Sequence, residues 1–215
     1  MTAAGQPASQ IYDGQFASFN GTLAYLGLLD GDTAANGSLG FQSARNVGNY
    51  DVTGLWSTKY DISLGGTTTL AITPRALTVS VGGSKVYDAQ LGFGNASFVL
   101  GNVVGGDSIT ASGSAVFLDK NAGNGKAVHA SGIALEGNGL GNYSLAATTV
   151  EGTGDITARL LNYGVTGAQS RVYDGNLQTG LNGYFEGLLT GDQVAMTGLQ
   201  GSFRDKNVGT GKVVD

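Results

Sequence analysis

The chain has 215 residues, a net charge of −5 and only 13% charged residues. A nucleic-acid-binding protein is expected to carry a basic stripe, but the 11 lysines and arginines are scattered along the sequence. No apolar run approaches the roughly 20 residues of a membrane-spanning helix, and cysteine is absent, which excludes disulfides and thiolate metal sites. Hydrophobic residues at 41% suffice for cores, and 38 glycines indicate many turns.

Residues 1–10 contain no β-branched aliphatic side chain and are expected to form a flexible leader. From residue 11 onward, three landmarks recur three times in one order. A Tyr-Asp pair is followed after 18 or 19 residues by a Gly-Asp pair, and after a further 14 or 15 residues by Asn-x-Gly. This order predicts an internal repeat. The repeated residues are Tyr12 and Asp13, Tyr87 and Asp88, Tyr173 and Asp174, then Asp32, Asp107 and Asp192, and finally Asn46, Asn121 and Asn207.

The segments between these landmarks alternate apolar and polar residues with the two-residue period of β-strands. In the second repeat we expect strands at 75–81, on either side of Gly113 at 107–112 and 114–118, at 126–135 with a break near Gly132, at 142–146 and at 154–157. In the first repeat the expected strands lie near 50–52, 59–63 and 69–73, and in the third near 159–165. Helical periodicity is hard to find, so the fold class is predicted to be all-β.

The joints between repeats recur as well, as Ile-Thr-Pro-Arg at 72–75 and Ile-Thr-Ala-Arg at 156–159. Each joint closes one repeat and opens the next with almost no linker, and Pro74 prevents the sheet from continuing across the first joint. We therefore expect a leader at 1–10, a first repeat at 11–73 without its opening strand, a complete second repeat at 74–157, and a truncated third repeat at 158–215. Stiff joints favour an elongated array.

The combined motif resembles a known family. Ile-Thr-Pro-Arg-Ala-Leu-Thr-Val, Lys-Val-Tyr-Asp, Gly-Gly-Asp, Asp-Lys-Asn, Gly-Asn-Tyr and Gly-Asp-Ile-Thr occur in this order and are similar to the YDG-type repeat of haemagglutinin-like bacterial exoproteins, many exported by two-partner secretion. The first repeat, with Asn46-Val47-Gly48-Asn49-Tyr50, is closer to the related MBG repeat. The resemblance implies tandem immunoglobulin-like β-sandwich modules and no active site. A β-solenoid is the alternative fold. Ala89 and Arg45 depart from the repeated pattern.

The landmark side chains are predicted to be structural. Each landmark tyrosine is expected to lie buried at a strand end with its hydroxyl bonded to backbone, the alternative being an exposed ring that stacks on a ligand. Asp13, Asp88 and Asp174 should accept backbone amides in the turn that follows. Asp32, Asp107 and Asp192 each follow a glycine, as turn residues do.

A metal site and an active site both find little support in the sequence. Calcium held by Asp88, Asp107 and Asp119 is an alternative to their structural roles, but the ion needs six to eight oxygens, and no EF-hand or nonapeptide loop is present, so no cofactor is expected. His129 is the only histidine, and no Gly-x-Ser-x-Gly turn occurs. The chain is therefore not expected to be an enzyme.

Together these observations favour a structural stalk or spacer of a bacterial cell-surface adhesin or extracellular filament, located outside the cell. Its partners would be neighbouring repeats, and incomplete end repeats suggest head-to-tail self-assembly by strand addition. The competing function is a module that binds a glycan or protein on a host or another surface through its end loops. Exposed aromatic side chains would favour binding, and the candidates are Trp56, Tyr184 and Phe185.

Overall fold

The computed structural model describes residues 2–4, 8–32, 35–66 and 68–215. Its described part is built of β-strands, and its one helical element is a three-residue 3-10 turn, η1, at Leu140–Asn142. The predicted all-β class is thereby confirmed. No helix in the described ranges is long and apolar enough to cross a membrane.

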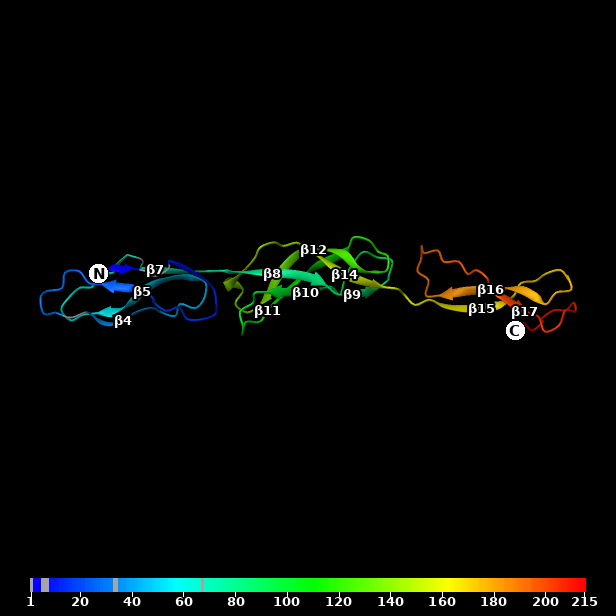
Figure 1. The fold of residues 1–215 in the computed structure, drawn as a ribbon, viewed down its shortest axis with the longest axis horizontal. Coiled ribbons are helices and arrows are strands. Elements are labelled where there is room, and N and C mark those ends of the chain that lie inside the picture. The colour runs from blue at the N-terminus through cyan, green and yellow to red at the C-terminus, as the bar shows by residue number, and fades with distance from the viewer. Residues whose placement is uncertain (1, 5–7, 33–34, 67) are drawn as a thin grey trace. The chain divides into compact units, whose positions relative to one another are not determined.

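The strands of the first repeat form two sheets, of order β2-β7-β5-β4 and β3-β1-β6 (Figure 1). Strand β1 and most of β2 lie within the segment expected to be a flexible leader, and residues 1 and 5–7 of that segment lie outside the described residues. The bounds are β1 Thr2–Ala4, β2 Ser9–Ile11, β3 Thr22–Ala24, β4 Asn36–Phe41, β5 Gly48–Trp56, β6 Gly65–Gly66 and β7 Thr69–Thr73.

The second repeat contributes sheets of order β10-β8-β13 and β11-β12-β14-β9. In β8 the predicted alternation is observed, since Leu77 and Val81 are buried while Thr78 and Ser80 are exposed. The expected pair of strands around Gly113 is instead one strand with an irregular register there. The bounds are β8 Arg75–Gly82, β9 Ser84–Val86, β10 Ser97–Gly101, β11 Ile109–Phe117, β12 Gly123–Gly137, β13 Tyr143–Leu145 and β14 Val150–Thr157.

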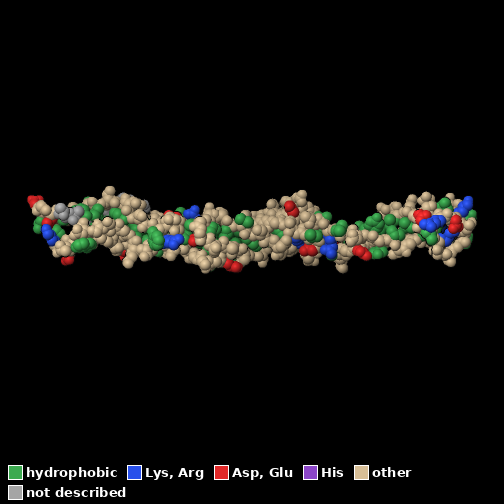
Figure 2. Space-filling view, turned by 90° about the horizontal axis from the view of Figure 1, so that it is seen from below, with side chains coloured by type: hydrophobic (Ala, Val, Ile, Leu, Met, Phe, Trp, Pro, Cys, Tyr) green, Lys and Arg blue, Asp and Glu red, His purple; other side chains and the backbone are tan. Residues whose placement is uncertain are grey.

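The third repeat forms an antiparallel sheet of order β15-β16-β17, with bounds β15 Asn162–Ala168, β16 Gln178–Glu186 and β17 Gln200–Ser202. Its apolar side chains are less buried than those of the second repeat. Leu160, Tyr163 and Val165 are all exposed, and Figure 2 shows a run of hydrophobic side chains on this part of the chain.

The chain divides into two compact units whose boundaries differ from those of the sequence repeats. The first unit consists of Met1–Gly83, Gly92–Phe117 and Ala127–Gly154, and the second of Ser84–Leu91, Leu118–Lys126 and Asp155–Asp215. The Tyr-Asp and Asn-x-Gly segments of the second repeat thus belong with the third repeat. Each unit therefore contains one entire joint between consecutive repeats.

A hydrophobic core of the first unit runs across its joint. Tyr12, Ala44, Leu70 and Ile72 come from the first repeat, and Leu77, Ile109 and Tyr143 come from the second, in one cluster of buried side chains. Burying such apolar surface contributes about 25 cal/mol per Å². The two repeats are consequently stabilised by a shared core, and the landmark Tyr12 lies within it.

Candidate functional site: the joints between repeats

In the first two repeats, the strand before the Tyr-Asp pair is paired in parallel with the closing strand of the same repeat. In the first repeat β2 pairs with β7 and the Tyr12 amide donates to the Thr73 carbonyl at 2.9 Å. In the second, β9 pairs with the end of β14 and the Tyr87 amide donates to the Thr157 carbonyl, also at 2.9 Å. Because the chain enters the next repeat directly after Thr73 or Thr157, this pairing places each tyrosine at the joint.

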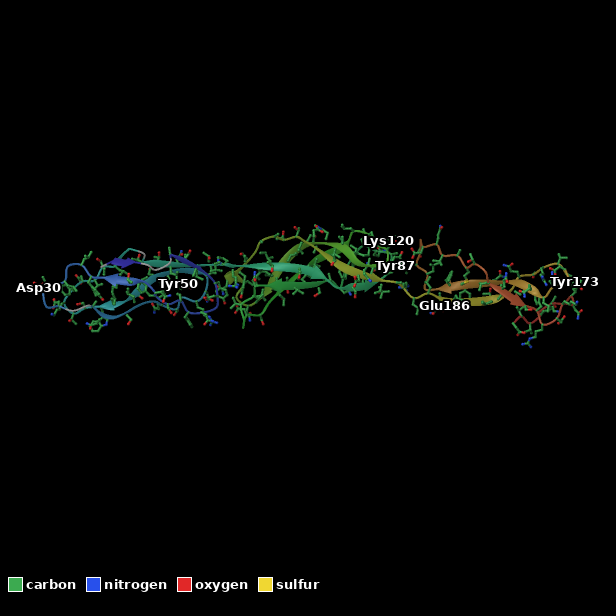
Figure 3. The ribbon with its side chains drawn as sticks, in the orientation of Figure 1. Asp30, Tyr50, Tyr87, Lys120, Tyr173 and Glu186 are labelled. Atoms are coloured by element: carbon green, nitrogen blue, oxygen red, sulfur yellow. The ribbon has the colours of Figure 1, made fainter. Side chains whose placement is uncertain are left out.

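The landmark tyrosine of one repeat bonds to the Gly-Asp aspartate of the next. The Tyr12 hydroxyl donates to Asp107 Oδ2 at 2.8 Å, and the Tyr87 hydroxyl donates to Asp192 Oδ1 at 2.8 Å. The prediction that these hydroxyls bond to backbone is wrong for both, because each donates to a carboxylate of the following repeat instead. Figure 3 labels Tyr87, which lies beside the start of the third repeat.

Each Gly-Asp pair ends a tight turn, as expected. The Asp107 amide donates to the Val104 carbonyl at 3.1 Å, and Asp32 and Asp192 make the equivalent bonds to Leu29 and Leu189. Gly106 has φ +97°, the left-handed conformation that a type II turn requires at its third residue and that glycine adopts without steric cost. The turn therefore presents the carboxylate toward the preceding repeat.

A second tyrosine holds this carboxylate from within its own repeat. The Tyr143 hydroxyl donates to Asp107 Oδ2 at 2.6 Å and accepts the Val104 amide at 3.1 Å. In the first repeat Tyr60 does the same: its hydroxyl donates to Asp32 and accepts the Leu29 amide. Tyr60 is thus the counterpart of Tyr143 in the first repeat.

Asparagine and arginine side chains complete the first joint. Asn142, which is buried, accepts the Val47 amide at 2.8 Å and donates to Asn46 Oδ1 at 3.1 Å. Arg75 donates from Nη1 to the Tyr12 carbonyl at 3.3 Å and from Nε to the Asn102 carbonyl at 2.8 Å. The sequence analysis did not predict these roles of Asn142 and Arg75. The arginine that recurs in Ile-Thr-Pro-Arg and Ile-Thr-Ala-Arg was a signal that could have indicated the role of Arg75.

The second joint contains fewer of these contacts. Arg159 repeats the Arg75 bond, donating from Nε to the Gly187 carbonyl at 2.9 Å. A cavity of about 270 Å³ lies beside Tyr87, Asn121 and Asp192, and the first joint has one of about 350 Å³ beside Tyr12, Asn46 and Asp107.

The three landmark tyrosines differ in how far their side chains are buried, and the two that bond to an aspartate of the next repeat are the more buried. Tyr12 is 2% exposed, Tyr87 is half-buried and Tyr173 is 60% exposed. The expectation of burial is therefore correct for Tyr12 and wrong for Tyr173. Burial of the ring depends on the next repeat rather than on the strand that carries it.

The aspartates of the Tyr-Asp pairs cap the turns that follow them, as expected. Asp13, Asp88 and Asp174 each accept, at 2.9 Å, the amide two residues further on. The last two of these aspartates also form salt bridges, Asp88 with Lys85 at 2.7 Å and Asp174 with Arg171 at 2.9 Å. In the first repeat Arg45 Nε donates instead to the Gly14 carbonyl at 2.9 Å, which explains the departure at position 45.

The departure at Ala89 carries backbone strain. Ala89 has φ +64°, whereas its counterparts Gly14 and Gly175 have φ +76° and +78°. A Cβ in this region costs about 1–2 kcal/mol. We expect Ala89→Gly to raise the free energy of unfolding by about 1 kcal/mol, measured by chemical denaturation. Gly175→Ala, where an added Cβ meets nothing within 4 Å, is the matched reverse change and should lower stability. Destabilisation by Ala89→Gly would contradict the assignment.

Burial and hydrogen bonding perturb the ionisable groups of the first joint. Burial, reinforced by the neighbouring Asp107 carboxylate, raises the pKa of Tyr12, and the same two causes raise the pKa of Tyr143 to about 12. The hydrogen bonds from Tyr143 and Tyr12 lower the pKa of Asp107. At the second joint, the hydrogen bond to Asp192 raises the pKa of Tyr87.

These shifts predict how stability depends on pH. The raised pKa values of Tyr12 and Tyr143 contribute stability that is present below the ordinary value of 10.0 and lost as pH rises toward 12. The lowered pKa of Asp107 contributes stability that is present above 3.8 and lost as pH falls below it. Denaturation followed by Trp56 fluorescence should show both declines. A Tyr143→Phe variant should flatten the alkaline decline, and a flat wild-type profile between pH 9 and 12 would contradict the prediction.

The remaining predicted residues do not form a second site. The three aspartates proposed for calcium have other partners: Asp88 pairs with Lys85, Asp119 pairs with Lys126, and Asp107 accepts the two tyrosine hydroxyls. The described residues contain no group of three or more His, Asp or Glu side chains placed to hold a metal ion. His129 Nδ1 lies 2.6 Å from Glu151 Oε1.

The three candidate aromatics differ in exposure. Trp56, at the end of β5, is 57% exposed, and Phe185 is half-buried. The Tyr184 ring lies over Gly164 on the neighbouring strand, since a Cβ at Gly164 would be 2.5 Å from it. Tyr184 is nevertheless 47% exposed, and Trp56 is the most exposed of the three.

Comparison with known proteins agrees with the repeated joint. Searches of the curated proteins and of the solved structures gave no significant match. The YDG domain matches residues 73–150 and 157–215, together more than half of the chain, and each match begins at a joint. The first repeat lies outside both matches, although its Asp32 and Tyr60 reproduce the geometry of Asp107 and Tyr143. By this match the chain belongs to the YDG domain family.

Proposed function

We propose that this chain is a non-catalytic structural spacer whose repeats are coupled end to end by the Tyr-Asp joint. The observation that carries the proposal is that the repeat landmarks contact one another across the joints. Tyr12 bonds to Asp107, Tyr87 bonds to Asp192, and Asn46 bonds to Asn142. Side chains that recur at fixed spacing are thus engaged in connecting repeats.

The joint has the features of a stiff connection. The closing strand of one repeat passes into the next repeat without a flexible linker, and it is held by the parallel pairing of β2 with β7. Arg75 then bonds back to the Tyr12 carbonyl, and Tyr12 bonds forward to Asp107. Contacts in both directions restrict rotation at the joint, whereas a Gly/Ser-rich linker would leave it free.

The wider context is proposed from the resemblance to haemagglutinin-like exoproteins. Modules of immunoglobulin-like β-sandwich type, repeated in an elongated array, would hold a distal adhesive region away from a bacterial surface or form part of an extracellular filament. Export by two-partner secretion suits a chain without cysteine, which must stay unfolded during export. The YDG domain match supports this context because it recurs in tandem along the chain.

Small-angle scattering of the chain and its Asp192→Ala variant tests the spacer function. The wild-type chain should give the profile of a stiff, elongated particle that calcium does not change. Loss of the Asp192 carboxylate should broaden the distribution of particle dimensions without changing the far-ultraviolet dichroism. Asp51→Ala, an exposed change on β5, is the control. A compact wild-type particle, or identical profiles for wild type and Asp192→Ala, would contradict the proposal.

A binding module is the second candidate, and the exposure of Trp56 favours it. An exposed indole is typical of sugar and protein recognition because it offers a large apolar face at small entropic cost. Titration of Trp56 fluorescence with a panel of glycans, with Trp56→Ala as the control in a direct binding assay, would decide whether this face binds one.

A further inference from the structure

The segment that opens the second repeat is shared between two sheets. Strand β8 lies in the sheet of order β10-β8-β13, and after Gly83 the chain continues as β9 in the sheet of order β11-β12-β14-β9 (Figure 1). Gly83 has φ +119°, a conformation that glycine adopts without steric cost. The first repeat has the same arrangement, with β1 in one of its sheets and β2 in the other. In both repeats the opening segment is therefore hydrogen-bonded into two sheets.

The second half of each opening segment pairs in parallel with the strand that closes the repeat. Strand β9 pairs over its whole length with residues 155–157 of β14, and β2 pairs in the same way with residues 71–73 of β7. The neighbouring pairs of β8 with β10 and of β11 with β12 are antiparallel. The parallel order means that the first and last strands of a repeat point in the same direction.

Tension along the chain would load this parallel pair in shear. The chain passes from Thr73 through Pro74 directly into β8, and it leaves the second repeat directly after Thr157. A pulling force therefore draws the first strand of a repeat toward its N-terminal end and the last strand toward its C-terminal end. In a parallel pair this force acts along the strands and loads all of their hydrogen bonds together. An antiparallel hairpin pulled at its two ends opens one hydrogen bond after another instead.

A threonine side chain reinforces the parallel pair in both repeats. Thr157 Oγ1 donates to the Lys85 carbonyl at 3.2 Å, and Thr73 Oγ1 donates to the Gln10 carbonyl at 3.2 Å. The amide of each landmark tyrosine adds a backbone bond to the same threonine. These bonds join the first strand to the last, so sliding of one strand past the other would break them. They give a role to the threonine that recurs in both Ile-Thr joints.

Buried side chains also fix the closing strands. Ile156 in β14 is 1% exposed, and Leu70 and Ile72 in β7 are 0% and 2% exposed. The backbone of β14 lies close to the opening segment, since a Cβ on Gly154 would be 3.0 Å from the Gly83 carbonyl oxygen. Protein interiors are close-packed, so sliding a closing strand would require its side chains to leave their sites as the hydrogen bonds break.

We propose that this chain bears tension, and that the parallel pair of first and last strands resists it in each of the first two repeats. We call this pair, β9 with residues 155–157 and β2 with residues 71–73, the shear clamp. The inference rests on the proposed function, because a spacer between two attached structures carries the force that acts between them. It goes beyond stiffness, since a stiff joint can connect repeats that unfold under a small force.

Pulling single molecules along two axes tests the shear clamp without changing its chemistry. The chain contains no cysteine, so handles can be attached at introduced cysteines, and Ala76, Ala158 and Thr149 are exposed. Ala76→Cys with Ala158→Cys defines the shear axis, which pulls the first and last strands of the second repeat in opposite directions. Ala76→Cys with Thr149→Cys defines the peeling axis, which pulls both strands apart from their N-terminal ends.

The unfolding force of the second repeat should be higher along the shear axis than along the peeling axis by about twofold or more. Resistance to force follows the unfolding barrier rather than the equilibrium stability, and both double variants leave every residue of the shear clamp unchanged. The comparison therefore isolates the direction of pulling. Equal forces along the two axes, or a higher force along the peeling axis, would overturn the inference.

A matched pair of substitutions tests the threonine bond. Thr157→Val removes the side-chain bond to the Lys85 carbonyl, and Thr153→Val is the same change at an exposed position of the same strand. Along the shear axis, Thr157→Val should lower the unfolding force and Thr153→Val should leave it unchanged. The same force for both variants would show that the threonine has no part in the shear clamp.

Failure of this inference can be told apart from failure of the proposed function. If the two axes give equal forces while scattering shows a stiff, elongated particle, the shear clamp is wrong and the spacer stands. If the force depends on direction in a chain that scatters as a compact particle, the shear clamp is supported and the spacer is contradicted.

Discussion

Replacing Tyr12 by alanine is expected to lower the free energy of unfolding of the first unit by about 3–5 kcal/mol, as truncation of a buried aromatic side chain does. Tyr12 is 2% exposed, contacts the Tyr143 ring edge-on at 5.4 Å between centroids, and lies in the core that the first two repeats share. Denaturation followed by the fluorescence of Trp56, the only tryptophan, measures the change in this unit.

The other two landmark tyrosines provide an internal comparison. Tyr87→Ala should lower the free energy of unfolding by less than Tyr12→Ala does, because the Tyr87 ring is only half-buried. Tyr173→Ala should leave thermal unfolding of the single chain unchanged, because the Tyr173 ring is exposed. Far-ultraviolet dichroism follows both variants in dilute solution. Equal destabilisation by all three substitutions would show that each ring acts within its own repeat, and would contradict the dependence on the following repeat.

Replacing Asp107 by alanine is expected to cost about 2–3 kcal/mol, the second-largest effect. Its Oδ2 accepts the hydroxyls of both Tyr12 and Tyr143. Both bonds are part-buried, so each hydroxyl that loses this acceptor should cost close to the lower end of the roughly 1–3 kcal/mol for a buried group. Asp107→Asn should cost less, since the amide oxygen can still accept one hydroxyl. Chemical denaturation at neutral pH measures both variants.

Asp30→Ala is the control for the loss of a carboxylate, because Asp30 is exposed within the Gly-Asp turn of the first repeat (Figure 3). It should change stability by no more than about 0.5 kcal/mol, as exposed substitutions usually do. If Asp107→Ala were as mild as Asp30→Ala, the Asp107 carboxylate would not be holding the joint.

Much of the local structure could be predicted from the sequence because local chemistry determines it. The capped turns after Asp13, Asp88 and Asp174 follow from the short reach of an aspartate to the amide two residues on. The turn before Asp107 follows from the glycine at a position that needs positive φ. Alternation in β8 predicts its buried face because only one side of that strand faces a core.

The partners across the joints could not be predicted from spacing within one repeat. Tyr12 and Asp107 are 95 residues apart, and Tyr87 and Asp192 are 105 apart, so each bond connects landmarks of different repeats. Whether Tyr173 is buried is likewise not a property of its own strand, since the covering surface belongs to a later repeat. Alternation also could not show that β11 continues through Gly113, because an irregular register and a break between strands both interrupt the pattern.

A double-mutant cycle between Tyr12→Phe and Asp107→Ala tests the central claim, that the landmarks couple consecutive repeats. The cycle isolates the interaction of the Tyr12 hydroxyl with a carboxylate of the next repeat. Denaturation of the four proteins should give a coupling energy of about 1 kcal/mol or more, because directly bonded groups couple by roughly 0.5–3 kcal/mol. Strictly additive effects would mean that the two side chains act independently, and that the Tyr-Asp landmarks do not join the repeats.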